Sequence, residues 1–388
     1  MRRLERYVNA GGKRLRCGYT TGTCAAAATR AAAELLLGAT EVPEVAVDTP
    51  AGVEVFVEVE RVERGDGWVE AFVRKDAGDD ADVTDGMLLA ARVERRAEPG
   101  VSIDGGPGVG RVTKVGLDQA VGEAAINSVP RAMIAEAACE AAQAHGFEGG
   151  LAVTISIPRG AELAAQTFNP RLGIEGGLSV LGTSGIVRPM SEEALVASIA
   201  LELKVLYETG ARDLVLVPGN FGHDFAVRTL GLDERIIVSC SNYLGAAIDE
   251  AALLGFDSVL LVGHLGKLVK VAAGVMNTHS RVADARLETL AAHAACAGAS
   301  QETVCAIMEA ATTDAALDLL EQAGLLERTM DRVTRQVGAH LAHRAAGRLA
   351  IEAVIFSRQR GLLGQTDGAE ALLLQHREQA GMTEGDMR

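Results

Sequence analysis

Short apolar runs that alternate with helix-like segments constrain the fold of this chain most. Three of the runs, at residues 213–217, 235–239 and 258–262, are almost continuously apolar. Such runs are typical of parallel strands covered on both faces. A shorter run at 178–181 comes before them. The segments between the runs have helical periodicity, so residues 176–286 predict a doubly wound α/β domain. These segments are Ser191–Thr209, Phe221–Leu230 and Asn242–Leu254.

Small and polar residues follow all four runs. Parallel strands end at a common edge of their sheet, and ligands of open α/β sheets bind there. We therefore expect a ligand site at this edge. It includes Gly182, Thr183, Ser184, Gly219, Asn220, Ser241, Asn242, Gly263, His264, Gly266 and Lys267. Neither a complete phosphate-binding G-x-x-x-x-G-K-[ST] pattern nor a G-x-G-x-x-G after a strand occurs in this half, which disfavours a nucleoside triphosphate or a dinucleotide.

The N-terminal half combines one helical segment with several strand-like runs. An alanine-rich helix over Ala25–Leu37, which either Thr21 or Thr23 could cap, ends before Gly38, and strand-like runs follow it. These runs lie at residues 45–47, 53–59, 68–74, 91–95 and 151–157. The helix start, Thr20–Thr23, is either an ordinary threonine cap or a place where free N–H groups receive an anion.

A glycine-rich segment and a loop histidine are further candidates. Gly105–Gly110 is followed by Arg111 and Lys114, which could hold anionic groups, although a hairpin without a ligand has the same composition. His279 lies in a polar loop, where it is either structural or titratable near neutral pH. The acidic segment 79–86 lacks the distal glutamate of a calcium loop, so we expect a solvated turn there.

Composition excludes several classes of protein. The net charge is −15 and aromatic residues make up 3% of the 388 residues, which argues against binding to nucleic acid. No apolar run approaches the roughly 20 residues of a membrane helix. Residues 1–16 are basic and lack the apolar core of a signal peptide, so we expect a cytoplasmic protein. The six cysteines contain no C-x-x-C pair, and we expect reduced thiols and no metal site of the protein's own.

Several long motifs in order resemble the CbiD family, the cobalt-precorrin-5B C-1 methyltransferases of anaerobic cobalamin synthesis. The resemblance covers residues 15–286 and is looser beyond them. The motifs are Arg16–Ala26 (RCGYTTGTCAA), Gly105–Gly110 (GGPGVG), Ala125–Asn127 with Pro130–Arg131, Leu181–Val187 (LGTSGIV) and Gly263–Lys270 (GHLGKLVK) through Asn277–Ser280 (NTHS).

This resemblance implies a two-part fold and a methyl-transfer reaction. It implies an N-terminal α+β domain similar to the second domain of ribosomal protein S5, at 1–175, and a Rossmann-like domain at 176–286. A mostly helical region, 287–388, would pack on both. The enzyme would transfer a methyl group from S-adenosylmethionine, bound at the strand ends, to a cobalt-precorrin. A homo-oligomer and transient contacts with other enzymes of the pathway are further expectations.

The resemblance also implies roles for the remaining candidate residues, in substrate binding and in proton transfer. A polycarboxylate substrate would meet local cations and backbone groups, and Asp104, His279 or water would accept the proton that the product releases. The expected substrate residues are Arg16, Thr20, Thr21, Gly22, Thr23, Gly106, Gly108, Arg111 and Lys114. Cobalt would arrive inside the macrocycle. A small-molecule phosphotransferase and a non-catalytic tetrapyrrole carrier are the alternatives.

Overall fold

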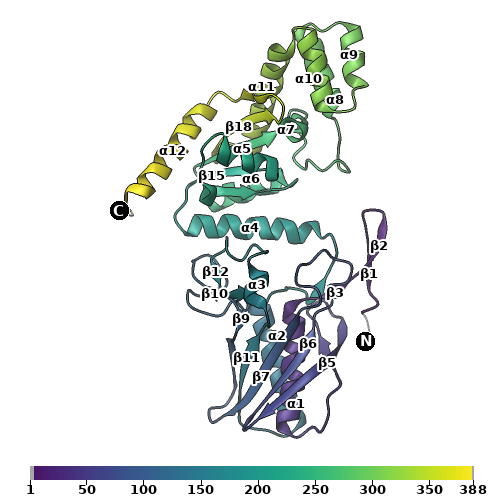
Figure 1. Cartoon of the computed structure of the whole chain (residues 1–388), viewed down its shortest axis with the longest axis vertical. Coiled ribbons are helices and arrows are strands. Elements are labelled where there is room, and N and C mark those ends of the chain that lie inside the picture. Colours follow the sequence, from purple (N-terminus) through teal and green to yellow (C-terminus); the bar gives the residue numbers. More distant parts are fainter. Residues whose placement is uncertain (1–3, 387–388) are drawn as a thin grey trace. The chain divides into compact units, whose positions relative to one another are not determined.

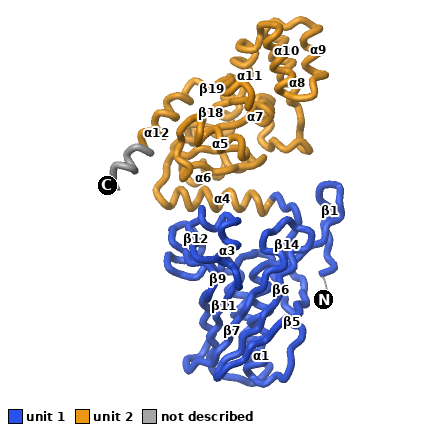
Figure 2. The backbone as a smooth tube through the Cα atoms, viewed as in Figure 1, with its two compact units in different colours: residues 1–192 blue, residues 193–388 orange. Residues whose placement is uncertain are grey.

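The structure, a computed structural model, describes residues 4–386 and has a mixed α/β fold. The chain divides into two compact units, unit 1 (Met1–Glu192) and unit 2 (Glu193–Arg388), shown separately in Figure 2. This single division differs from the expected boundaries at 175 and 286. Residues 176–192 group with unit 1 because their backbone pairs there, and the last hundred residues group with unit 2.

Unit 1 is built on a six-stranded sheet with two helices packed on one face (Figure 1). Only β8 and β11 pair in parallel in this sheet; its other neighbours are antiparallel. The strand order is β4 (Glu44–Asp48), β5 (Glu54–Gly65), β6 (Trp68–Arg74), β7 (Leu88–Arg96), β11 (Gly150–Ser156) and β8 (Val101–Gly105). The helices are α1 (Thr21–Leu37) and α2 (Ser128–Ala144).

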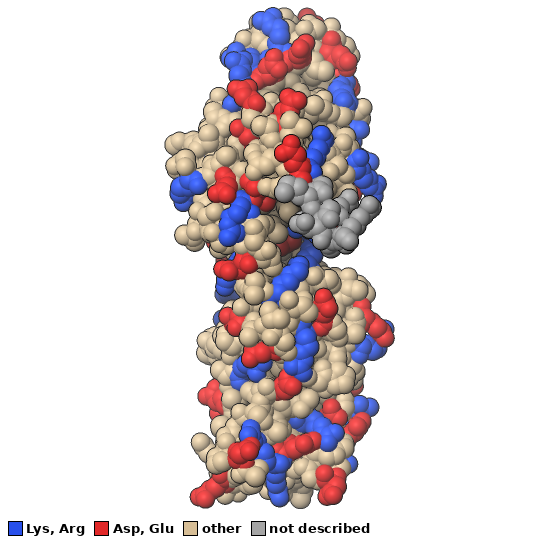
Figure 3. Space-filling view, turned by 90° about the vertical axis from the view of Figure 1, so that its left-hand side faces the viewer, with Lys and Arg blue, Asp and Glu red and all other residues tan. Residues whose placement is uncertain are grey.

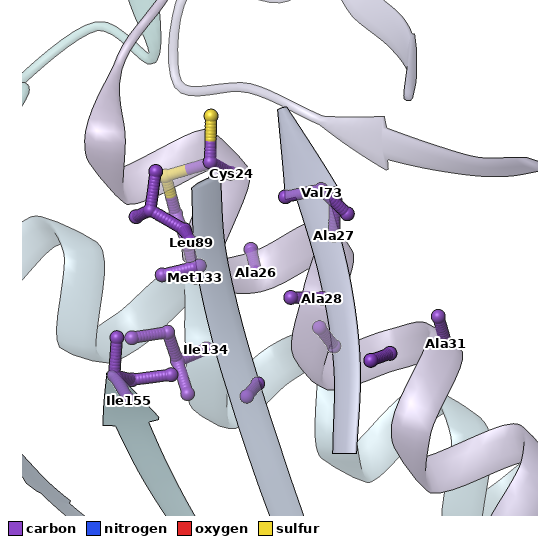
Figure 4. Packing of buried hydrophobic residues seen from close by; sticks show 14 of the residues in the cluster. Cys24, Ala26, Ala27, Ala28, Ala31, Val73, Leu89, Met133, Ile134 and Ile155 are labelled. Atoms are coloured by element: carbon purple, nitrogen blue, oxygen red, sulfur yellow. The ribbon is translucent and has the colours of Figure 1, made fainter. Parts of the chain in front are cut away.

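The alanines of α1 let this helix approach both the sheet and α2 closely. Ala26, Ala27, Ala28 and Ala31 are fully buried, and Figure 4 shows them among apolar side chains of the sheet and α2. An alanine loses no side-chain entropy on burial and leaves room for larger neighbours. The helix therefore lies at the centre of the unit 1 core, as its apolar composition predicts.

Short strands outside this sheet hold the loops of unit 1. They are β1 (Tyr7–Ala10) with β2 (Lys13–Arg16), β3 (Gly18–Tyr19) with β14 (Ile186–Val187), β9 (Gly108–Val109) with β13 (Gly177–Leu178), and β10 (Arg111–Val112) with β12 (Ile174–Glu175). A short helix, α3 (Gly160–Ala164), precedes β12. The run 178–181 was expected to join the parallel sheet, and this is wrong: its first residue extends β13, which pairs with β9 in unit 1.

Unit 2 contains a five-stranded sheet with helices on both faces. Its first four strands are parallel and the last is antiparallel. In β15, Leu214 and Leu216 face one apolar cluster, while Val215 and Val217 face the other. The strand order is β16 (Ile237–Ser239), β15 (Asp213–Val217), β17 (Ser258–His264), β18 (Ala350–Ser357) and β19 (Gly361–Gln365).

The helices of unit 2 divide between the two faces. The face with Leu214 packs against α4 (Glu192–Glu208), α6 (Leu244–Leu254), α7 (Leu265–Val271) and α11 (Leu326–Ala345). The opposite face packs against α5 (Asn220–Arg228) and α12 (Ala369–Asp386). Between α7 and α11 lie α8 (Arg286–Ala297), α9 (Gln301–Met308) and α10 (Thr313–Gln322). Residues 287–388 are thus not a separate helical region, because β18 is an inner strand of the sheet.

A buried histidine makes the stability of unit 2 sensitive to pH. His376 in α12 is 1% exposed, and neither ring nitrogen has a hydrogen-bond partner among the described residues. Burial lowers its pKa, while the charge of Asp213 partly raises it. Asp213 also accepts hydrogen bonds from Ser258 and Gln379. The ring is therefore neutral in the fold, and its protonation favours the unfolded chain.

We expect the free energy of unfolding to decrease as the pH falls below the unfolded pKa of about 6.5 and through the lower folded value. The slope for one such group is at most about 1.4 kcal/mol per pH unit. Urea unfolding of the wild type and His376→Leu at pH 7.5 and pH 5.5 measures this. The variant should lose less stability between the two pH values, and equal losses would show that His376 does not contribute.

Candidate functional site

The carboxyl ends of β15, β16 and β17 lie together at one edge of the unit 2 sheet. Val217 pairs with Ser239, and Leu216 pairs with Leu261, so the three strands finish at similar heights. Seven of the predicted residues directly follow or end these strands. They are Gly219, Asn220, Ser241, Asn242, His264, Gly266 and Lys267. Gly263 lies within β17, where an added Cβ would be 2.8 Å from the side chain of Leu268.

Lys267 joins two of these strand ends. Its ammonium group donates hydrogen bonds to the carbonyl oxygen of Pro218, after β15, and to that of Ser241, after β16, the latter at 3.2 Å. Burial lowers the pKa of Lys267, the fully buried Cys240 thiol partly raises it, and the nearby charge of Lys270 lowers it further. Because both contacts are to backbone, Lys267 fixes the relative position of the strand ends.

His264 caps the helix that follows β17. Its Nδ1 accepts a hydrogen bond from the backbone N–H of Gly266 at 3.1 Å, so the neutral ring carries its proton on Nε2. Burial lowers the pKa of His264; the charge of Asp314 raises it and that of Arg358 lowers it. His264 therefore presents an N–H donor near neutral pH. Phe356 packs edge-on against the ring, with centroids 5.6 Å apart.

The loop that contains His279 is tied to the end of β16. The Thr278 hydroxyl and the Asn242 amide oxygen are 3.1 Å apart, and the Thr278 N–H donates to the Asn242 carbonyl oxygen at 2.9 Å. The buried Lys270 also donates to the Thr278 carbonyl oxygen, at 3.0 Å. Lys270 was not among the predicted site residues, although a lysine between apolar residues of α7 indicates a buried amine with hydrogen-bond partners. His279 accepts at Nδ1 from the N–H of Arg281 at 3.1 Å, so its neutral ring also carries the proton on Nε2.

The loop with Gly182, Thr183 and Ser184 belongs to unit 1, not to this sheet edge, because its backbone contacts the start of α1. The Gly22 N–H donates to the Leu181 carbonyl oxygen at 3.1 Å, and the Thr23 hydroxyl donates to that of Gly185 at 2.7 Å. Thr20, Thr21 and Thr23 are at most 7% exposed. The Gly22 N–H and the Thr23 hydroxyl at the start of α1 therefore donate their hydrogen bonds to the backbone of unit 1.

Two predicted substrate cations form ion pairs. Arg16 contacts Asp76 through both terminal nitrogens, each at 2.7 Å, with its side chain 15% exposed. Arg111 contacts Asp104 at 2.8 Å, and both side chains are more exposed than the Arg16 pair. Lys114 donates to the carbonyl oxygen of Arg171 at 3.2 Å. The hydrogen bond from Arg111 is the main reason that the pKa of Asp104 is lowered, so this carboxylate is a weak base.

Close packing explains the glycines of the hairpin. A Cβ added to Gly106 would lie 2.5 Å from the Ser156 hydroxyl, and one added to Gly108 would lie 1.9 Å from the carbonyl oxygen of Ile157. Gly108 also has a φ of +79°, which disfavours other residues. The backbone of this segment therefore packs against β11 and the residues that follow it. Close packing accounts for these glycines without the bound ligand that the sequence analysis gave as one of two alternatives.

The surface carries charges of both signs. Figure 3 shows Lys and Arg side chains interspersed with Asp and Glu over the visible face. The described residues contain no group of three or more histidine, cysteine or acidic side chains placed to hold a metal ion. In the same residues, no helix has the length and apolar character needed to cross a membrane.

Comparison with known proteins identifies the family. Residues 8–189 match the family model CbiD, and residues 277–367 match CbiD, C-terminal domain. The cobalt-precorrin-5B C(1)-methyltransferase of Ruminiclostridium cellulolyticum is 48% identical over 91% of this chain and 92% of its own length. The enzyme of that name from a Thermoanaerobacter species is 45% identical over 93% of this chain and 98% of its own.

A solved structure is also similar. It is the cobalamin biosynthesis protein CbiD from Archaeoglobus fulgidus, with 31% sequence identity and a TM-score of 0.39. The match covers 72% of this chain and 87% of that one. The sequence matches extend over most of the chain at high identity, and the chain therefore belongs to the CbiD family.

Proposed function

We propose that this chain is a C-methyltransferase that methylates C-1 of cobalt-precorrin-5B, giving cobalt-precorrin-6A, with S-adenosylmethionine as the methyl donor. The observation that carries this proposal is the 48% identity, over 91% of the chain, to a relative named for that reaction. Seven further relatives, at 40–45% identity, have the same name.

We place the methyl donor at the strand ends of unit 2. The sulfonium is already activated, so the protein needs to bind and orient it and exclude water, and orientation alone lowers a barrier by several kcal/mol. Support comes from the convergence of Gly219, Asn220 and Ser241 with the N–H donor of His264 at one sheet edge. Lys267 would position this edge. Asn242, Gly263 and Gly266 would hold the backbone close to the donor.

The acceptor site is proposed from unit 1. A polycarboxylate substrate competes best for cations whose present partners are exposed, which favours Arg111 and Lys114 over the less exposed Arg16. Within unit 1, Asp104 is a weak candidate for accepting the proton released at the ring, because the hydrogen bond from Arg111 lowers the pKa of that carboxylate. His279, in unit 2, is the other candidate. A base role would require His279 to release the N–H of Arg281 from Nδ1.

Asp104→Asn tests that assignment. We expect methyl transfer to stay within about threefold of the wild type, since an exposed ion pair contributes about 0–1 kcal/mol. Single-turnover rates under anaerobic conditions provide the measurement. A loss of more than about a hundredfold would identify Asp104 as the base, because a general base contributes about 10²–10⁴.

We also propose a more specific fold description for each unit. The helix pair on one sheet face of unit 1 supports similarity to the second domain of ribosomal protein S5. The parallel strands of unit 2, with helices on both faces, support a Rossmann-like description. A cytoplasmic location, homo-oligomerisation and transient contacts with other cobalamin enzymes stay predictions.

An anaerobic assay with methyl-labelled S-adenosylmethionine and cobalt-precorrin-5B tests the function. We expect label in the corrinoid at C-1 and formation of S-adenosylhomocysteine. Tight macrocycle binding without transfer would instead identify a carrier, and ATP binding without binding of the methyl donor would identify a phosphotransferase.

A further inference from the structure

We infer that Arg358 is a carboxylate-binding residue of the unit 2 sheet edge and that Phe221 positions it. This inference rests on the proposed function, since it assigns a further contact to the ligands of that reaction. The two residues come from different elements: Phe221 is in the first turn of α5, after β15, and Arg358 follows β18. Neither was predicted from the sequence, because their proximity depends on the pairing of β18 with β17, which a single sequence does not show.

The turn that carries Arg358 is anchored. It joins β18 to β19, and the N–H of Arg360 donates to the Ser357 hydroxyl at 3.0 Å. The guanidinium of Arg360 forms ion pairs with Asp318 and Glu321 of α10. Anchoring on both sides restricts the backbone at Arg358. Less conformational freedom is then lost when this side chain binds a ligand.

The side chain of Arg358 is oriented by an aromatic ring. Its guanidinium carbon lies 4.6 Å from the centre of the Phe221 ring, over the ring face. A guanidinium that lies over a ring keeps its N–H donors available at its edges, the directions in which a carboxylate binds with two hydrogen bonds. Both side chains are exposed, Phe221 by 53%.

The donors of Arg358 are not used within the described structure. No described residue forms an ion pair or a hydrogen bond with its guanidinium, in contrast to Arg16, which contacts Asp76, and Arg111, which contacts Asp104. The net charge of −15 disfavours the approach of anions in general. An oriented arginine without an acidic partner therefore provides a local positive charge that can attract an anion to this place.

Its position connects Arg358 to the proposed methyl-donor site. The Phe221 and His264 rings have centroids 6.5 Å apart, and the charge of Arg358 lowers the pKa of His264. Arg358 therefore lies beside the ends of β15 and β17. The ligands of the proposed reaction offer carboxylates from two sources, the methionyl group of the donor and the side chains of the macrocycle.

Titration calorimetry on the full-length chain tests the inference and distinguishes the sources. The variants are Arg358→Ala, Arg358→Lys, which keeps the charge without the planar donor group, and Phe221→Leu, which removes the ring. Arg228→Ala is the control, since it removes an exposed charge from the last turn of α5. The probes are S-adenosylmethionine, its decarboxylated analogue and, anaerobically, cobalt-precorrin-5B.

We expect Arg358→Ala to weaken binding of one carboxylate-bearing probe by about tenfold or more, as hydrogen bonds between charged groups require. Arg358→Lys should recover only part of this loss, and Phe221→Leu should lose part of the affinity. If the partner is the methionyl carboxylate, the decarboxylated analogue should bind wild type and Arg358→Ala equally. If it is the macrocycle, only cobalt-precorrin-5B should lose affinity.

Losses within about twofold of the Arg228→Ala control for both carboxylate-bearing probes would overturn the inference. A wild type that binds S-adenosylmethionine and transfers methyl, with an unaffected Arg358→Ala variant, would contradict the role of Arg358 alone. If the wild type binds neither S-adenosylmethionine nor cobalt-precorrin-5B, the proposed function is contradicted instead. Circular dichroism and urea unfolding of each variant would show that the fold is retained.

Discussion

Gly219→Val is expected to reduce the affinity for S-adenosylmethionine by more than about a hundredfold, or about 2.7 kcal/mol, while the protein stays folded. Gly219 precedes α5 with a φ of +150°, and the nearest atom to an added Cβ is the Lys267 ammonium at 3.8 Å. The new side chain would therefore enter the space above the strand ends rather than the core. Calorimetric titration with the donor measures the effect.

Two glycine variants provide the controls. Gly231→Val places a side chain at another positive φ in unit 2, with nothing within 4 Å, and should leave donor binding unchanged. Gly182→Val should destabilise unit 1, because its Cβ would lie 2.5 Å from the Thr20 side chain. Folded Gly182→Val protein should still bind the donor. Loss of binding in folded Gly182→Val, with normal binding in Gly219→Val, would move the donor site to unit 1.

Lys267→Met is expected to have the second-largest effect. The variant keeps the apolar stem but leaves the carbonyl oxygens of Pro218 and Ser241 without their donor, which costs about 1–3 kcal/mol. We expect a lower free energy of unfolding and at least tenfold weaker donor binding, since the ends of β15 and β16 are no longer joined. Lys204→Met, at an exposed position of α4, is the matched control.

Steady-state kinetics separate the two possible roles of Lys267. If Lys267 positions the edge, Lys267→Met should raise KM for the donor and lower kcat together, because the whole edge shifts, and should also lower the free energy of unfolding. If Lys267 only contacts the ligand, the free energy of unfolding should stay unchanged. Unchanged unfolding and unchanged donor affinity in Lys267→Met would contradict the role proposed from its hydrogen bonds.

Local patterns predicted the strands and helices of unit 2 well, but not all of their partners. The run 213–217 forms β15 with the same bounds, and the run 258–262 forms β17, which continues to His264. The run 178–181 has similar apolar character, yet it extends β13 in unit 1. Strand pairing depends on contacts far apart in sequence, which composition does not specify. For the same reason the position of β18 in the sheet was not predicted, because five helices separate it from β17 along the chain.

The candidate site shows a similar limit. Residues after β15, β16 and β17 were predicted to gather, since the edge rule needs only the strand positions. The ion pairs of Arg16 with Asp76 and of Arg111 with Asp104 were not predicted, because a charged residue shows no partner in a single sequence. Arg358 was missed because its strand was not assigned to the sheet.

Hydrogen–deuterium exchange of the full chain, with and without saturating S-adenosylmethionine, tests the donor site most directly. We predict protection of backbone amides at 219–222, 240–243 and 264–267, the segments at the carboxyl ends of β15, β16 and β17. Amides at 181–185 and 20–24 should exchange at the same rate with and without the donor. Protection confined to those two unit 1 segments, with no change at the strand ends of unit 2, would contradict the proposed site.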